Sequence, residues 1–270
     1  MASTVSDVIA ALDAAYPRDL AESWDAVGLV CGDPADGVER VLVCVDPVTA
    51  TVDEALEWGA QLVVAHHPLL LRGVHGVGTD TAKGRLVHRL VRAHAALFCA
   101  HTNADSAVPG VSDALAERIG VRVVRPLAPH ADGPGSTGIG RIGELPEAVP
   151  FAEFVRRVAA ALPATRPGVL GAGDPDRLVR TVAVSGGAGD SYLAEATAAG
   201  VDVYVTADLR HHPAGEHLEQ GGPALVGLTH WASEWPWCEQ AAEVIRQVGD
   251  IEVRVSTRCT DPWTVRAGQP

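Results

Sequence analysis

Histidine and acidic side chains stand together at the ends of four apolar runs that are typical of buried strands. The runs LVVA, ALFCA, VYVTA and LVGLT are followed by HH, HTNAD, D and HWASE. Neutral imidazole and carboxylate groups are ligands for zinc, iron, manganese, nickel and cobalt, and the absence of a thiolate beside them argues against a closed structural zinc site. The residues concerned are His66, His67, His101, Asp105, Asp208, His230 and Glu234.

The number and spacing of these residues favour two metal ions over one. Neighbouring side chains on an extended strand point to opposite sides, so His66 and His67 are expected to serve two ions on either side of the chain, unless one of them turns past the strand end. His230 and Glu234 have the i, i+4 spacing that brings two side chains to one face of a helix. With Asp105 they make five ligands, too many for one open site. Two ions held close together can activate a bridging hydroxide for hydrolysis.

Each motif also has an ordinary explanation. The HHP tripeptide recurs at 211–213, and most such pairs are solvated turn residues. HTNAD is also typical of an Asn/Asp turn after a strand, and the step from His230 to Glu234 is also typical of a helix start capped by Ser233. Their joint occurrence favours metal binding, because ligands of parallel sheets collect at the carboxyl ends of the strands.

Strands and helices alternate along the chain, which predicts an α/β fold with mostly parallel sheets covered on both faces. Strands are expected at 27–31, 40–46, 61–65, 96–101, 179–185, 201–207, 224–229 and 251–256. Helices are expected at 49–58, 83–93, 111–119, 151–162 and 238–248, and after Asp190. A further helix is expected at the N-terminus, where Thr4 and Asp7 have capping-box spacing and Pro17 ends the helix.

The chain is expected to form two related α/β halves. The first half is placed at 1–125, with 251–270 packing back on it, and the second at 141–250. Between them, 126–140 is rich in Pro and Gly and is interpreted as a linker. EALEWGAQLVVAHHP resembles EATAAGVDVYVTAD, and ALFCAHTNAD resembles ALVGLTHWASE. This faint repeat predicts halves related by a pseudo-twofold axis, with the metal site between them.

Composition and charge limit the classes of partner. The chain has 270 residues, 47% of them hydrophobic, and a formal net charge of −13, which argues against binding to long nucleic acids or anionic membranes. Five cysteines without CxxC spacing are typical of buried thiols in a reduced compartment. No run approaches the roughly 18 apolar residues of a membrane span, and the N-terminal segment lacks the basic region of a signal peptide. A cytoplasmic location is therefore expected.

Two segments near the expected site have more than one interpretation. Residues 184–190, VSGGAGD, join a strand to a helix, and the backbone N–H groups of such a loop can face an anion. The alternative is a simple tight turn. The aromatic segment 231–237, WASEWPW, is interpreted as part of a subunit interface rather than a stacking platform for a base. The candidates for substrate binding are Ser185, Gly186, Gly187 and Asp208.

The motifs AHHP, HTNAD, SGGAG, VYVTAD and THWASE, in that order, resemble the Nif-three-like dinuclear-metal-centre family, whose members are often described as GTP cyclohydrolase 1 type 2 homologues. The resemblance spans nearly the whole chain and matches the short form, without the inserted middle domain of longer members. It implies a toroidal homohexamer whose metal sites face an internal cavity, and two divalent ions per subunit, with Glu234 as the bridge. The implied metal ligands are His66, His67, Asp105, His230 and Glu234.

The chain departs from the family pattern at three places. The motifs WDNxG, TGD and GHxxxE appear here as WDAxG, TAD and THxxxE, so Ala26, Ala207 and Thr229 replace the usual residues. None of the three changes removes an implied ligand. Ala207 and Thr229 each replace a glycine and can reshape the backbone beside the site, which affects the identity of the substrate more than the binding of metal.

The leading functional hypothesis is a metal-dependent hydrolase that acts on a purine nucleotide such as GTP, or a similar small molecule, through a metal-bridged hydroxide. In this hypothesis His101 is a proton shuttle or supports a ligand from behind. Two alternatives remain, namely a non-catalytic metal-binding assembly that regulates or binds partners, and a dinuclear phosphoesterase. The native metal stays open among zinc, iron, manganese, nickel and cobalt. One ion is assigned to His66 and Asp105, the other to His67 and His230, with Glu234 shared.

Overall fold

The computed structural model describes residues 3–130 and 135–267, and the chain divides into two compact units. Unit 1 contains residues 1–107 and 238–260, and unit 2 contains residues 108–237 and 261–270. Helix α9 (His230–Arg246) begins in unit 2 and ends in unit 1, with Pro236 inside the helix next to the point of division. Across the described residues, every helix is too short or too polar to cross a membrane.

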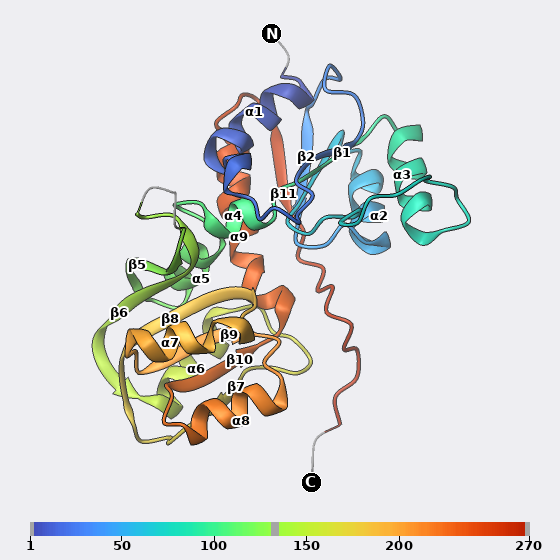
Figure 1. Cartoon of the computed structure of the whole chain (residues 1–270). Helices are drawn as coiled ribbons and strands as arrows, with labels where there is room; N and C mark the ends of the chain where they lie inside the picture. Colours follow the sequence, from blue (N-terminus) through green and yellow to red (C-terminus); the bar gives the residue numbers. More distant parts are fainter. Residues whose placement is uncertain (1–2, 131–134, 268–270) are drawn as a thin grey trace. The chain divides into compact units, whose positions relative to one another are not determined.

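Unit 1 is built on a five-stranded sheet with the order β1-β4-β3-β2-β11, of which Figure 1 labels β1, β2 and β11. Neighbours among the last four strands of this order run parallel, and β1 pairs antiparallel with β4. Its strands are β1 (Gly28–Cys31), β2 (Arg40–Cys44), β3 (Leu62–Ala65), β4 (Ala96–Cys99) and β11 (Glu252–Val255). Its helices are α1 (Val5–Ala15), η1 (Arg18–Leu20), α2 (Thr49–Trp58), α3 (Ala82–Arg92) and α4 (Thr102–Ser106).

Unit 2 contains a six-stranded sheet with the order β5-β6-β8-β9-β10-β7. Only β8, β9 and β10 run parallel to one another, while β5, β6 and β7 pair antiparallel with their neighbours. The strands are β5 (Arg122–Pro129), β6 (Gly138–Pro150), β7 (Leu170–Ala172), β8 (Leu178–Ala188), β9 (Val203–Ala207) and β10 (Ala224–Leu228). The helices are α5 (Val111–Arg118), α6 (Phe151–Ala161), η2 (Asp190–Tyr192), α7 (Leu193–Ala199) and α8 (His211–Glu219).

The α/β fold with two related halves is confirmed, whereas two details differ from the expectation. Unit 1 is mostly parallel as predicted, but half of the strands in the second sheet are antiparallel. The stretch 126–140 contains the end of β5 and the start of β6, which pair with each other, so its described part is more than a linker. Four of its residues, 131–134, lie outside the described part of the chain.

The division between the units also falls at other residues than expected. The first segment of unit 1 ends at Ala107. Of the C-terminal stretch 251–270, residues up to Thr260 belong to unit 1, in which β11 pairs parallel with β2. The following residues belong to unit 2.

The repeat seen in the sequence corresponds to a shared order of elements in the two units. In unit 1 the order is β2-α2-β3-α3-β4-α4, and in unit 2 it is β8-α7-β9-α8-β10-α9. In each unit the three strands are parallel neighbours. Parallel strands need crossover connections of this kind, and their carboxyl ends meet at one edge of the sheet. The strand ends that carry the candidate ligands therefore have equivalent positions in their own units.

Burial on both faces explains the apolar strands. Along β8, Val182 and Val184 pack into a cluster with α5 and α6, while Ala183 between them packs with α7 on the other face. All four residues of β3 are fully buried in the same way. This two-sided burial is typical of parallel strands and removes the alternation of polar and apolar residues.

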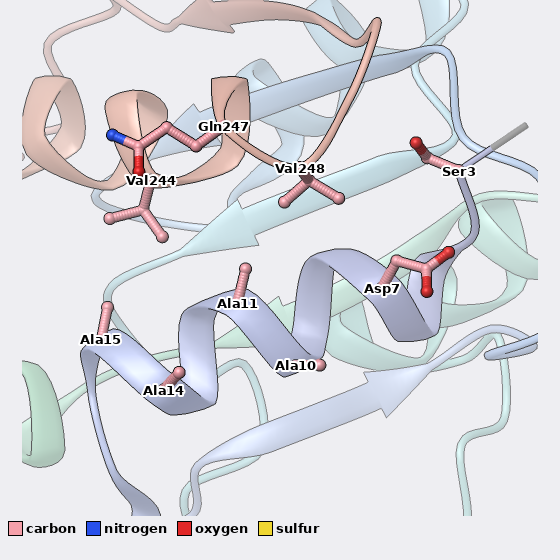
Figure 2. Close-up of a pocket in the computed structure, with 9 residues that line it drawn as sticks. All are labelled: Ser3, Asp7, Ala10, Ala11, Ala14, Ala15, Val244, Gln247 and Val248. Atoms are coloured by element: carbon pink, nitrogen blue, oxygen red, sulfur yellow. The ribbon is translucent and has the colours of Figure 1, made fainter.

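A groove lies along helix α1 in unit 1 (Figure 2). It has a volume of about 710 Å³ and is lined by four alanines of α1, by Ser3 and Asp7, by Val244 of α9, and by Gln247 and Val248 just after that helix. None of these residues is a candidate metal ligand. The groove is therefore separate from the chemistry that the sequence predicts.

Local hydrogen bonds to acidic side chains also fix the sheet of unit 2. The carboxylate of Asp202, just before β9, accepts hydrogen bonds from the N–H groups of Arg180 and Thr181 and from the Thr181 hydroxyl. Partial burial, the largest influence, acts to raise the pKa of Asp202, but these hydrogen bonds outweigh it and hold the pKa below its ordinary value of 3.8. The charged carboxylate therefore stabilises the pairing of β8 with β9.

Replacement of Asp202 by asparagine is expected to lower the free energy of unfolding by about 1 kcal/mol at neutral pH, since solvent screening limits the effect of a partly exposed charge. Because the folded pKa is lowered, the stabilisation is present above the unfolded pKa and is lost as the pH falls through the folded pKa. The difference between wild type and Asp202→Asn should shrink below about pH 4. Urea unfolding at several pH values measures it. A difference that is constant down to pH 2 contradicts the assignment.

Candidate metal centre

Three histidines of unit 1 converge at the carboxyl ends of two neighbouring strands. His66 and His67 follow β3, and His101 follows β4. One ring nitrogen from each lies within 4.8 Å of the others. The ring centroids are 5.0 Å apart for His66 and His67 and 5.2 Å apart for His66 and His101. This convergence is the arrangement that a metal-binding set of imidazoles requires.

Of the two arrangements expected for His66 and His67, the turn past the strand end is the one observed, and the rings do not face apart as on a continued strand. The strand ends at Ala65, and the backbone then bends before Pro68. In a regular parallel strand successive N–H groups point to opposite neighbours. Here the N–H groups of both histidines donate to carbonyls of the same neighbouring segment, those of Cys44 and Val45. The backbone has thus left strand geometry, and both rings lie on one side.

His66 is held by an acceptor on its inner ring nitrogen. Its Nδ1 lies 2.9 Å from the carbonyl oxygen of Ala100. A carbonyl only accepts, so Nδ1 is the donor, and in the neutral ring the lone pair is on Nε2. That Nε2 lies 3.6 Å from Oδ1 of Asp105, as expected for two groups directed at one cation. Asp105 is on the short helix α4 that follows β4.

His67 and His101 repeat this arrangement with carboxylates. Nδ1 of His67 lies 2.7 Å from Oδ1 of Asp46, and Nδ1 of His101 lies 2.8 Å from Oδ1 of Asp25. Metal-binding histidines generally donate their second ring N–H to a carboxylate or carbonyl, which fixes the tautomer and the ring orientation. In unit 1 all three converging histidines therefore have an acceptor at Nδ1, as metal-binding histidines generally do.

Asp25 is a strongly held carboxylate. Burial, the largest influence, acts to raise its pKa, but hydrogen bonds from His101 and from the N–H and hydroxyl groups of Thr102 reverse the effect and hold the pKa far below the ordinary value of 3.8. Asp25 stays negatively charged at any pH near neutral. It can therefore stabilise positive charge on the ring of His101, whether that charge comes from a proton or from a cation.

The donor set of unit 2 is built around the start of α9. Nε2 of His230 lies 3.0 Å from Oε1 of Glu234 on the same helix face, which confirms the i, i+4 geometry. Nδ1 of His230 lies 2.7 Å from Oδ2 of Asp208. Asp208 follows β9 with a positive φ of 54°, which non-glycine residues adopt rarely and Asp more readily than most. Asp208 thus orients His230. The sequence suggests Asp208 only as a residue that binds substrate.

The glycine-rich end of β8 packs against Glu234, so residues 185–188, expected to lie in a loop, continue the strand. Gly187 has a positive φ of 69°, and a Cβ built there would lie 2.5 Å from Oε1 of Glu234. Its N–H donates to the hydroxyl of Ser233, and the N–H of Gly186 lies 3.4 Å from the hydroxyl of Ser112. These N–H groups therefore have partners within unit 2. The substrate-binding role of Gly186, Gly187 and the buried Ser185 stays a prediction, and the two glycines leave room for the side chain of Glu234 beside them.

The structure separates the candidates from the residues set aside. Within unit 1 the structure brings His66, His67, His101 and Asp105 together. Within unit 2 it brings His230, Glu234 and Asp208 together. The exposed pair at 211–212 begins helix α8 instead of forming a turn. The three indoles of 231–237 are buried, which favours the protein core over the expected subunit interface.

The sequence reasoning missed three supporting residues. Asp46 follows the strand β2, so the strand-end criterion used for the ligands would have found it. Asp25 precedes the antiparallel β1 and carries no such signal. Thr260 lies in the irregular segment after β11, and its hydroxyl donates to Asp46.

The residues present fit divalent metal ions by the chemistry of the donor set. The described part of the chain offers imidazoles with defined tautomers, each beside a carboxylate or a second imidazole, and Glu234 is buried. A buried carboxylate costs several kcal/mol unless a cation or hydrogen-bond donors compensate it. Imidazole and carboxylate together suit zinc, iron, manganese, nickel and cobalt.

Taken together, the elements define an α/β protein of two related units, each with a set of metal-ligand types at the carboxyl ends of its parallel strands. The family model described as Duf34/NIF3 (NGG1p interacting factor 3) matches residues 3–262. The chain belongs to this family.

Two relatives illustrate the similarity in sequence. A Streptomyces coelicolor protein named "GTP cyclohydrolase 1 type 2 homolog" is 53% identical over 266 residues, covering 96% of this chain and 93% of the relative. A Mycobacterium tuberculosis protein of the same name is 41% identical over an alignment of 372 residues, covering 98% of each chain. Because this chain has 270 residues, the mycobacterial relative carries residues that the short form lacks.

Solved structures share the fold. A Bacillus cereus protein related to NIF3 has a TM-score of 0.90 at 24% identity, covering 98% of this chain and 100% of the relative. Reduced HcgD from Methanocaldococcus jannaschii has a TM-score of 0.78 at 25% identity, covering 94% of this chain and 98% of the relative. These structural similarities confirm the predicted fold, and the family model confirms the predicted family.

Proposed function

We propose that the chain binds two divalent metal ions and acts as a metal-dependent hydrolase on a purine nucleotide or a similar small molecule. The observation that carries the proposal is the hydrogen bonding of the histidine rings at Nδ1. His66, His67 and His230 all have Nδ1 beside a carbonyl or carboxylate, so each ring can present Nε2 to a cation. In this proposal His66 and Asp105 bind one ion, His67 and His230 the other, and Glu234 is shared.

The chain's own residues have distinct parts in the proposed reaction. Two bound divalent ions would polarise the substrate and make water more acidic. His101 is the candidate proton carrier, because its ring is beside the histidines of unit 1 and its Nδ1 is fixed by the permanently charged Asp25. Asp46 and Asp208 orient the rings of His67 and His230 by accepting hydrogen bonds from Nδ1. The negative charge of the acidic side chains favours the binding of cations.

The substrate class rests on the relatives' names. Proteins up to 53% identical to this chain are named as homologs of GTP cyclohydrolase 1 type 2, which favours a purine nucleotide as substrate. A homohexameric assembly and a cytoplasmic location belong to the same proposal. The second candidate function is a non-catalytic metal-binding assembly that regulates or binds partners, and a phosphoesterase is the third. Metal chemistry alone favours none of the three.

Metal quantification followed by a nucleotide screen tests the proposal. Protein purified without chelator is expected to contain two transition-metal ions per chain by mass spectrometry of the elements. Reloaded with manganese, zinc or iron, it is expected to release formate or phosphate from a panel of purine nucleotides, with products identified by mass. Formate supports the cyclohydrolase reaction, and phosphate alone supports the phosphoesterase. Full metal content without turnover supports the regulatory function, and the absence of stoichiometric metal contradicts all three.

A further inference from the structure

The segment that follows β11, residues 256–260, is hydrogen-bonded to helix α2. After β11, the hydroxyl of Ser256 donates to Oε2 of Glu54, at 2.7 Å, and Nε of Arg258 lies 3.1 Å from the same oxygen. The N–H of Ser256 also donates to the carbonyl of Val43 in β2. The segment has no helix or strand geometry of its own, so these contacts fix its position.

At the end of this fastened segment, Thr260 contacts the carboxylate that supports a candidate ligand. The Thr260 hydroxyl donates to Oδ2 of Asp46. The other carboxylate oxygen of Asp46, Oδ1, accepts from Nδ1 of His67 at 2.7 Å. The side chain of Asp46 is therefore held at both oxygens, one by the C-terminal segment and one by the imidazole. All three residues belong to unit 1.

We propose that Thr260 is a positioning residue for metal binding, which acts on the ligand His67 through Asp46. The inference rests on the proposed function, since it needs His67 to bind an ion. A carboxylate held at both oxygens cannot rotate about its Cβ–Cγ bond, so the hydrogen bond to Nδ1 keeps its direction and Nε2 keeps its aim. Partners of this kind, one step behind a ligand, typically change metal affinity by 10- to 100-fold.

His67 differs in its support from the other two histidines of unit 1. His66 is supported by the carbonyl of Ala100, which no side chain of the C-terminal segment contacts among the bonds of the described residues. His101 is supported by Asp25, which is held by Thr102. Loss of the Thr260 hydroxyl should therefore disturb one ion and spare the other.

Cobalt titration of the metal-free full chain tests the inference, with a competing chelator to resolve two binding steps. Thr260→Val keeps the side-chain shape and removes the hydroxyl, and is expected to weaken one step about 10-fold or more while leaving the other unchanged. Thr260→Ser keeps the hydroxyl and should restore the wild-type affinity. Thr257→Val is the matched control, because it makes the same change at an exposed position of the same segment, and should resemble wild type.

The outcomes distinguish this inference from the function on which it rests. Wild-type protein that binds no cobalt contradicts the proposed function itself. If wild type binds two ions and Thr260→Val binds both with unchanged affinity, Thr260 has no positioning role while the function stands. If Thr260→Val weakens both steps equally and lowers the melting temperature in parallel, the role of Thr260 is only structural, and the inference is overturned.

Discussion

Replacement of Gly187 by alanine is expected to abolish the binding of at least one ion while the protein stays folded. The new Cβ would lie 2.5 Å from Oε1 of Glu234 and 3.4 Å from Nε2 of His230. Real Cβ atoms do not approach an oxygen so closely, so the Glu234 carboxylate must shift from the position in which it lies 3.0 Å from Nε2 of His230. Since Glu234 is the proposed shared ligand, a displacement of about 1 Å would disturb both ions.

The alanine also strains the backbone, and a matched variant separates the two effects. Gly200 at the end of α7 has a φ of 66°, close to the 69° of Gly187, but a Cβ there would meet nothing within 4 Å. Each alanine is expected to cost roughly 1–2 kcal/mol of stability through its left-handed conformation. Only Gly187→Ala should lose metal, as measured by elemental analysis, alongside the unfolding midpoint of both variants. Equal metal content in the two variants would falsify the steric explanation.

Replacement of Glu234 by alanine is expected to reduce the metal content from two ions per chain to at most one. The carboxylate is 3% exposed and lies 3.0 Å from Nε2 of His230. Without the Glu234 carboxylate, unit 2 keeps one candidate ligand, the imidazole of His230, together with Asp208, which orients that ring. Metal content after purification without chelator, and after reloading, measures the loss.

A control on the same helix tests whether the effect is specific to the site. Glu239 is also on α9 but is exposed, so Glu239→Ala should keep both ions. Circular dichroism and elution volume show whether each variant is folded. Full metal content in folded Glu234→Ala would mean that Glu234 is not a ligand, and the donor set of unit 2 would need another member.

The positions of the candidate ligands could be predicted because they depend on local rules. Polar residues directly after apolar runs lie at strand ends, and parallel strands place their carboxyl ends at one edge. The i, i+4 spacing of His230 and Glu234 is equally local. The family resemblance, which the comparisons confirm, rests on the same strand-end motifs.

The rest of the site could not be predicted, for three physical reasons. The convergence of His66 and His67 depends on a bend that begins one residue after the strand, whereas alternation assumes that the strand continues. Asp25 reaches His101 across 76 positions of sequence, which no spacing rule anticipates. The antiparallel strands near 126–140 contain many Pro and Gly residues, and this composition predicts a loop. The strand is compatible with these residues because β5 lies at the sheet edge, where they are tolerated.

The discontinuous composition of unit 1 has a consequence for how the protein is made on the ribosome. Residues 1–107 emerge first, then all of unit 2 up to Trp237, and only afterwards residues 238–260 with β11. Until then one edge of β2 lacks its parallel neighbour, and Asp46 lacks Thr260. Because Thr260 follows residues 108–237 in the sequence, the support of His67 is completed only after those residues of unit 2 have been synthesised.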